Sequence, residues 1–124
     1  MAKWSSDVML DQALNWVKTT ATRMTVCNSQ PTTHLQASAT YALAFTVMAA
    51  GDFTLADGDT SGRKIAVAQK ANIAVGTTGT ATHIALFSYS GTPLCYVTTC
   101  ATQQLTSGNT VTVPTWDIEI RDPA

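Results

Sequence analysis

Hydrophobic and polar residues alternate along most of the chain at the two-residue period of β-strands. The clearest case is Trp116–Arg121, where three apolar side chains alternate with three charged ones. Asn109–Val113 repeats this pattern, and Pro114 separates the two segments. Because proline has no amide hydrogen to donate, it interrupts a strand or marks a sheet edge. The stretch from Gly79 to Arg121 therefore predicts four strands around which the domain is organised.

The most regular part of this stretch is a predicted hairpin. Thr80–Ser88 and Leu94–Thr99 have strand patterns, and a short connection with glycine and proline, residues 89–93, joins them. Strict alternation in the first strand places Ile84 and Leu86 on one face, and Ala81, His83, Ala85 and Phe87 on the other. Neither face is fully polar, so this strand is either central in a sandwich or covered by a neighbouring subunit.

A single strong helical pattern occurs near the start, over about residues 6–19. Its apolar side chains recur at helical spacing, at Leu10, Ala13, Leu14 and Val17. Ser6 or Asp7 is suited to cap the first turn, and Lys18 lies near the negative end of the helix dipole. The polar face has only one lysine, whereas membrane-surface helices are rich in Lys and Arg. We therefore expect the helix to pack on the β core.

Shorter strand patterns fill the middle of the chain, at Arg23–Cys27, Phe53–Ala56 and around Ile65–Val67 and Ile73–Val75. Residues 32–41 have no clear pattern, and we expect a loop there, followed by a short strand around Phe45–Met48. About eight strands at intervals of roughly ten residues are typical of a sandwich. The fold class is therefore mainly β, an antiparallel β-sandwich or jelly-roll-like domain with one N-terminal amphipathic helix. We predict one domain, 1–124, whose β-rich core spans about residues 23–121.

Charge is scarce in this chain. Only 12% of its 124 residues are charged, and 22 threonines and 18 alanines take much of their place. The net charge is −1, which argues against nucleic-acid binding because phosphate contacts need a basic surface. The first residues lack a signal-peptide pattern, and no apolar run is long enough for a membrane span, so we expect folding in the cytoplasm. A surface poor in charge is one that partner proteins readily cover.

The three cysteines, Cys27, Cys95 and Cys100, form an odd set in a chain without an export signal. We expect reduced thiols. The spacing of Cys95 and Cys100 does not fit a zinc knuckle, and a second pair of ligands is missing. His34 or His83 would be needed to activate a cysteine nucleophile, but the sequence does not place either beside one.

One loop, 57–62, has a sequence that partly matches a cation-binding site. Asp57, Asp59 and Ser61 match the first half of a calcium-binding EF-hand loop, with Gly62 at the sixth position. The twelfth position is Ala68 instead of glutamate, and a strand pattern follows instead of a helix. Asp-Gly and Ser-Gly pairs are also typical of tight turns, and we favour the turn. We expect no metal and no cofactor.

Catalytic signatures are missing as well. Glu119 is the sole glutamate, and it shares the polar face of a predicted strand with Asp117, so a convergent carboxylate pair is not indicated. The chain has no nucleophile-elbow, P-loop or zinc-protease motif. We therefore predict that the protein is not an enzyme.

Several short segments spread over nearly the whole chain are informative together, and none of them is a catalytic motif. They are DQALN (11–15), CNSQPTT (27–33), YALA (41–44), GDFT (51–54), DGDTSGRK (57–64), GTATH (79–83), LCYVTTC (94–100) and WDIEI (116–120). Through these segments the sequence resembles small structural proteins encoded among the virion genes of tailed bacteriophages.

This resemblance implies a virion component, and we expect a capsid decoration or cement protein that binds the major capsid protein. The copies are expected to form dimers or trimers, matching the symmetry axes of a shell. Candidate partner-contact residues are Trp4, Ala85 and Phe87. Two alternatives remain: a tail, neck or head-fibre component, and a carbohydrate-binding module for host recognition, for which exposed aromatic residues would be the signature.

Overall fold

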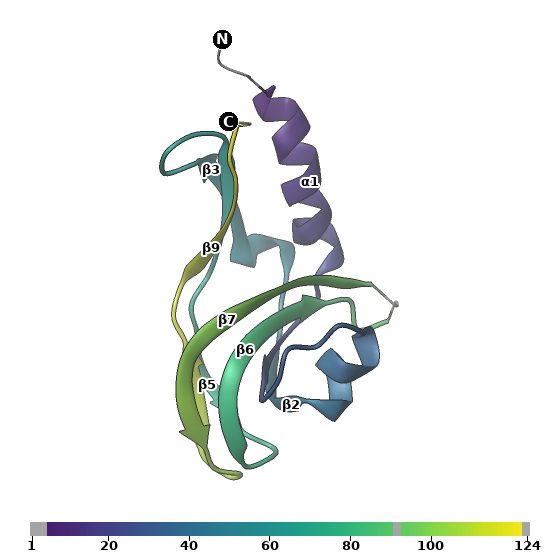
Figure 1. Cartoon of the computed structure of the whole chain (residues 1–124), viewed down its shortest axis with the longest axis vertical. Coiled ribbons are helices and arrows are strands. Elements are labelled where there is room, and N and C mark those ends of the chain that lie inside the picture. Colours follow the sequence, from purple (N-terminus) through teal and green to yellow (C-terminus); the bar gives the residue numbers. More distant parts are fainter. Residues whose placement is uncertain (1–4, 91–92, 123–124) are drawn as a thin grey trace.

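Antiparallel sheets and one α-helix make up the fold (Figure 1). The computed structural model describes residues 5–90 and 93–122. Within them the strands are β1 (Arg23–Cys27), β2 (Ala42–Val47), β3 (Phe53–Asp57), β4 (Arg63–Val67), β5 (Lys70–Ala74), β6 (Gly79–Phe87), β7 (Leu94–Leu105), β8 (Thr110–Val113) and β9 (Trp116–Ile120). They form sheets in the orders β2-β1-β6-β7, β3-β4-β9 and β5-β8. The mainly β, sandwich-like prediction is confirmed, and the described strands form three hydrogen-bonded sheets.

The predicted helix is α1 (Asp7–Thr20). The Ser6 hydroxyl accepts a hydrogen bond from the Val8 amide at 3.3 Å, so Ser6 is the N-cap. The buried side chains are three of the four in the predicted apolar stripe, Leu10, Leu14 and Val17. α1 lies along β3-β4-β9 (Figure 1). Arg63 of β4 fixes it there, because its Nε donates to an Asp11 carboxylate oxygen at 2.9 Å.

A main hydrophobic core joins α1 to all three sheets. Its members come from every strand, with Leu105 contributed by the end of β7, and Cys95, Tyr96 and Cys100 of β7 pack on it while partly exposed. The largest fully buried side chain is Phe53, at the start of β3. The helix and the sheets therefore share one core.

The predicted hairpin is β6–β7, and its second strand is longer than expected. β7 continues to Leu105 instead of ending at Thr99. Its last residues pair with the start of β6 beyond an irregularity in the ladder: His83 pairs with Thr99, but Ala81 pairs with Gln103. Strict alternation placed Ala81 on the face of Ala85, whereas the structure buries it in the main core beside this irregularity.

The segment predicted as a loop contains a helical turn. η1 (Gln36–Thr40) is a π-helical turn, and Thr33 Oγ1 accepts a hydrogen bond from the Gln36 amide just before it. The following strand, β2, begins at Ala42, earlier than predicted, and ends at Val47. A short 3₁₀ turn, η2 (Ala50–Asp52), then leads into β3. The Ala-rich sequence hides these boundaries because a short apolar run has no periodicity that distinguishes a helix from a strand.

Candidate functional site

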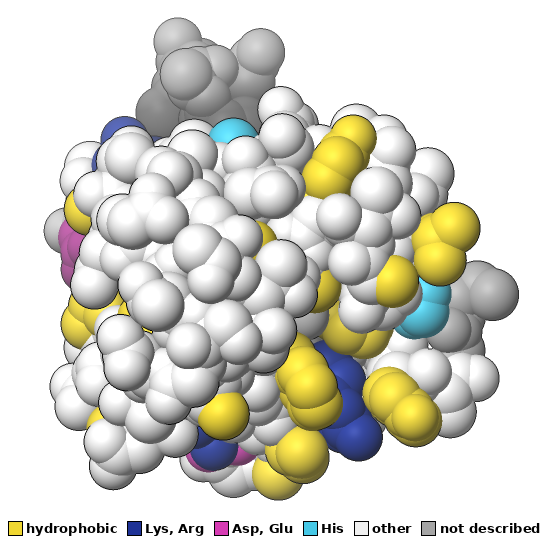
Figure 2. Space-filling view, turned by 90° about the horizontal axis from the view of Figure 1, so that it is seen from below, with side chains coloured by type: hydrophobic (Ala, Val, Ile, Leu, Met, Phe, Trp, Pro, Cys, Tyr) yellow, Lys and Arg dark blue, Asp and Glu magenta, His cyan; other side chains and the backbone are white. Residues whose placement is uncertain are grey.

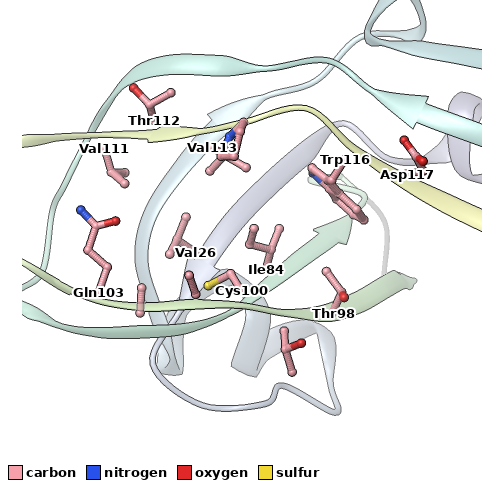
Figure 3. Close-up of a pocket in the computed structure, with 14 residues that line it drawn as sticks. Val26, Ile84, Thr98, Cys100, Gln103, Val111, Thr112, Val113, Trp116 and Asp117 are labelled. Carbon is pink, nitrogen blue, oxygen red and sulfur yellow. The ribbon is translucent and has the colours of Figure 1, made fainter.

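A cleft lies between β7 and the β8–β9 segment. It has a volume of about 350 Å³. Val26 of β1 and Ile84 of β6 line it from the four-stranded sheet, and Val111 and Val113 line it from β8 (Figure 3). This size lies within the range of about 300–1,000 Å³ that is typical of ligand sites.

Trp116 forms one end of the cleft, and Gln103 lies at the other (Figure 3). The Trp116 ring stacks on Tyr96 with a centroid distance of 5.9 Å, which holds the indole in place. Its Nε1 is buried and has no hydrogen-bond partner among the described residues. An unpaired buried N–H is costly, so a bound acceptor at this position would stabilise the site.

Cys100 also lines the cleft, between β7 and β8. All three cysteines are free thiols. Burial raises the pKa of Cys100 and of Cys95, and it raises the pKa of Cys27 despite a hydrogen-bonding contact with Thr25. A raised pKa leaves little thiolate at neutral pH, which argues against a cysteine nucleophile.

The histidines make contacts within the fold, and His83 of β6 lies opposite Cys27 of β1 in the sheet. His34 Nε2 lies 2.7 Å from the Ser88 carbonyl oxygen, and its ring meets Phe87 edge-on at 5.1 Å. His83 Nδ1 lies 2.8 Å from the Thr82 hydroxyl. Both histidines therefore take part in intramolecular packing and hydrogen bonding.

The 57–62 loop closes as a tight turn. The Gly58 amide donates to the Gly62 carbonyl oxygen at 3.0 Å. Asp57 pairs with Arg63 at 2.7 Å, and Asp59 pairs with Lys64 at 2.7 Å. These carboxylates already bind cationic side chains, as the turn interpretation expects. Across the described residues, no group of three or more His, Cys, Asp or Glu side chains is placed to hold a metal ion.

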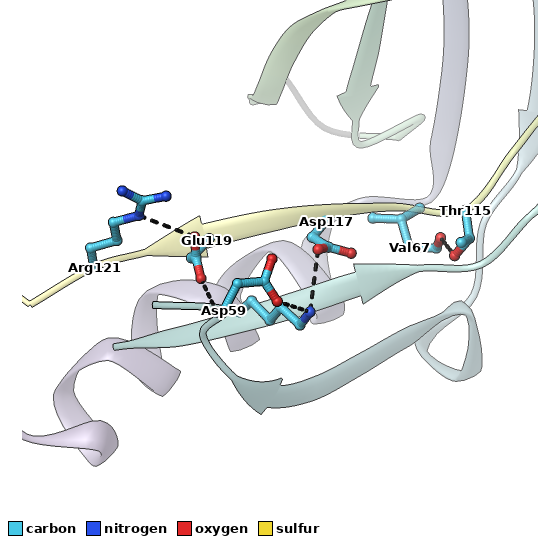
Figure 4. Close-up of polar contacts among 7 residues, drawn as sticks. Asp59, Val67, Thr115, Asp117, Glu119 and Arg121 are labelled. Carbon is cyan, nitrogen blue, oxygen red and sulfur yellow. Dashed lines mark hydrogen bonds and ion pairs between the residues drawn. The ribbon is translucent and has the colours of Figure 1, made fainter. Parts of the chain in front are cut away.

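Asp117 and Glu119 extend this network along β9 (Figure 4). Lys64 lies 3.4 Å from Asp117, and Arg121 lies 3.3 Å from Glu119. Glu119 also accepts a hydrogen bond from the Asp59 amide. The two carboxylates therefore hold the loop against the strand.

Exposed apolar side chains gather around Arg23, next to the β2 edge. Phe45, Val47 and Tyr89 are 60%, 57% and 68% exposed. Arg23 pairs with Val47 across β1 and β2, and its guanidinium carbon lies 4.4 Å from the centre of the Tyr89 ring. Arg23, Phe45 and Tyr89 line one shallow hollow. Figure 2 shows hydrophobic side chains bordering a basic one on the face seen from below. We call these four residues the Phe45 patch.

The predicted contact residues have different surroundings from this patch. Ala85 and Phe87 are 0% and 3% exposed and form a second apolar cluster with Cys27 and Ala37 of η1. Residues of the same chain therefore cover the face of β6 that holds Ala85 and Phe87, which the sequence analysis considered as a contact surface for a neighbouring subunit. Trp4 lies outside the described residues.

The Phe45 patch and the cleft were not anticipated from the sequence. Phe45 and Val47 alternate with Ala44 and Thr46, and this pattern could have marked an exposed apolar face. The cleft depends on how β7 and β8 lie relative to each other, and the pattern of apolar and polar residues within either strand does not predict this arrangement.

Comparison with protein-family models, with curated proteins and with solved structures found no match. The described helices include none that is long and apolar enough to span a membrane.

Proposed function

We propose that this chain is a virion structural protein of a tailed bacteriophage, a capsid decoration or cement protein that binds the major capsid protein. The resemblance to small phage structural proteins supports the class. The observation that carries the binding role is the Phe45 patch, where three large apolar side chains are more than half exposed around one arginine. Clustered exposed apolar residues mark protein-binding surfaces.

The composition of the patch fits a protein partner. Tyr and Arg are enriched at the centres of protein interfaces, and Phe and Val contribute buried apolar area. The Arg23–Tyr89 contact holds two of these side chains in a defined geometry before binding, which lowers the entropic cost of association. Because such a protein binds only the assembled shell, it stabilises that shell by mass action.

A structural role also agrees with the ion pairing of the carboxylates and the protonation of the thiols. Asp57, Asp59, Asp117 and Glu119 are all engaged in ion pairs, and burial keeps the thiols protonated. Groups held in this way are poorly suited to acid–base or nucleophilic chemistry. We therefore propose a non-enzymatic protein, present as dimers or trimers on the shell.

Replacing Phe45 by serine is expected to weaken binding to the shell by roughly 10- to 30-fold, because it removes a large apolar anchor. The fold should persist, since the side chain is exposed. The measurement is rebinding of purified variants to particles assembled without this protein.

Val8→Ser is the matched control, because Val8 is 67% exposed on α1, outside the patch. We expect it to bind as the unaltered protein does. If Phe45→Ser bound as tightly as the unaltered protein, the Phe45 patch would not be the capsid-binding surface. If the unaltered protein did not bind, the capsid role itself would be contradicted.

A further inference from the structure

The cleft between β7 and the β8–β9 segment lies between two layers of the fold. Its floor is a face of the four-stranded sheet, where Val26 of β1, Ile84 of β6 and Thr98 of β7 are paired in register. Val111 and Val113 of β8 lie across the cleft from this floor (Figure 3). Because protein interiors contain few voids larger than a water molecule, a cleft of about 350 Å³ has the size expected of a ligand site.

The cleft is apolar inside and opens to solvent at its rim. The fully buried residues of its lining are all apolar: Val26, Ala81, Ile84, Val111 and Val113. Other lining positions, at 99, 101, 103, 112 and 114, are exposed. A small molecule can therefore enter from solvent, and its apolar part is then removed from water, which favours binding.

An unpaired hydrogen-bond donor lies at one end of the cleft. Trp116 Nε1 is buried and has no partner among the described residues. Figure 3 shows this nitrogen on the edge of the indole that is turned toward Val113. The stack on Tyr96 fixes the ring, so the donor has a defined direction. A buried N–H without an acceptor is costly, and a ligand that supplies an acceptor at this end removes that cost.

The charge beside this donor favours a neutral ligand over an ionised one. Asp117 follows Trp116 on β9 and also lines the cleft, whereas the lining within the described chain includes no lysine or arginine. A ligand carboxylate at the indole would lie beside a like charge in apolar surroundings. A neutral carbonyl oxygen accepts the same hydrogen bond without this cost.

We propose that the cleft binds a small, neutral, apolar molecule with one carbonyl oxygen, such as a ketone or an ester. At about 30 Å³ for a group the size of a water molecule, the volume holds roughly a dozen non-hydrogen atoms. The carbonyl oxygen accepts from Trp116 Nε1, and the hydrocarbon part lies between Ile84 and Val111. This site is separate from the Phe45 patch, so the inference does not depend on the capsid role.

Two other occupants fit less well. Ordered water would satisfy the indole, but a buried water typically makes about three hydrogen bonds, and the buried lining is apolar. A strand or helix of a partner protein is larger than the cleft, which has room for only one or two side chains. A neutral carbonyl compound matches the volume, the apolar lining and the donor together.

The test is calorimetric titration with butyrophenone, a neutral aromatic ketone. Two probes of similar size are the controls: butylbenzene lacks the acceptor, and 4-phenylbutyrate has an ionised one. We expect butyrophenone to bind about 5- to 10-fold more tightly than either, the increment of one hydrogen bond. In ¹⁵N–¹H NMR spectra, butyrophenone should shift the indole resonance of Trp116 downfield.

The cysteines of β7 provide an internal control for the location of the ligand. Cys100 lines the cleft, whereas Cys95 of the same strand does not, and both thiols are free and partly exposed. Saturating butyrophenone should slow the alkylation of Cys100 by iodoacetamide at least tenfold and leave that of Cys95 unchanged. Mass spectrometry measures both rates in the same sample.

Trp116→Phe keeps an aromatic ring and removes the donor. It should weaken butyrophenone binding about 5- to 10-fold and leave butylbenzene binding unchanged. Trp16→Phe is the matched control, because Trp16 is 47% exposed on α1, outside the cleft. If Trp116→Phe does not fold, which circular dichroism checks, the NMR shift and the Cys100 protection of the unaltered protein decide.

Three results would overturn the proposal. Butyrophenone could fail to bind, which would exclude the site. It could bind no more tightly than butylbenzene or 4-phenylbutyrate, which would exclude the neutral carbonyl class. Alkylation could slow equally at Cys95 and Cys100, which would place the ligand outside the cleft.

Discussion

Replacing Phe53 with alanine is expected to lower the free energy of unfolding by about 3–5 kcal/mol. Phe53 is 2% exposed and is the largest fully buried side chain in the described chain. It begins β3 and pairs with Val67 of β4, in the core shared by α1 and the sheets. Removing the ring leaves a cavity that these elements cannot fill together. Urea or guanidinium unfolding, followed by circular dichroism, measures the loss.

Phe45→Ala is the control with identical chemistry. Phe45 is 60% exposed on β2, so the same truncation should change the free energy of unfolding by about 0.5 kcal/mol or less. If the two variants lost similar stability, the assignment of Phe53 to the core and of Phe45 to the surface would be incorrect.

Gly62→Ala is the second large effect, with an expected loss of about 2–4 kcal/mol. Gly62 has φ +73°, a conformation that costs a residue with a side chain roughly 1–2 kcal/mol. In addition, a Cβ atom at this position would overlap the Ile120 carbonyl oxygen of β9. The obstacle is backbone, so the strand or the loop would have to shift. Thermal and denaturant unfolding would show the loss.

Substitutions at two other glycines distinguish the cost of the positive φ from the cost of the overlap with β9. Gly108 has φ +93° with no atom near the Cβ position, so Gly108→Ala should lose only the conformational term of about 1–2 kcal/mol. Gly51 has neither constraint, and Gly51→Ala should be close to neutral. Equal losses in Gly62→Ala and Gly108→Ala would show that the contact with β9 contributes nothing.

The elements that the sequence predicted well are those with a local cause. α1 has an apolar stripe and a serine N-cap, and β9 has strict alternation, so each could be placed to within one or two residues. The 57–62 turn could be anticipated from its Asp-Gly and Ser-Gly pairs. Such signals are contained in a few neighbouring residues.

The features that escaped prediction depend on distant residues. The bulge in β7 exists only in relation to β6, and Ala81, which lies beside it, belongs to the main core. Phe87 looked available to a neighbouring subunit, but η1 and its flanking loop cover it. The cleft arises because β7 and β8 belong to different sheets. Alternation within a strand identifies apolar faces without identifying what covers them.

The central claim is that this chain decorates the capsid, and quantitative gel densitometry of purified particles tests it most directly. The 13.1 kDa band is compared with the major capsid protein band. A decoration protein predicts a ratio near one copy per capsid subunit, or a simple fraction set by the lattice. A handful of copies per particle, or absence from the particle, would contradict the account.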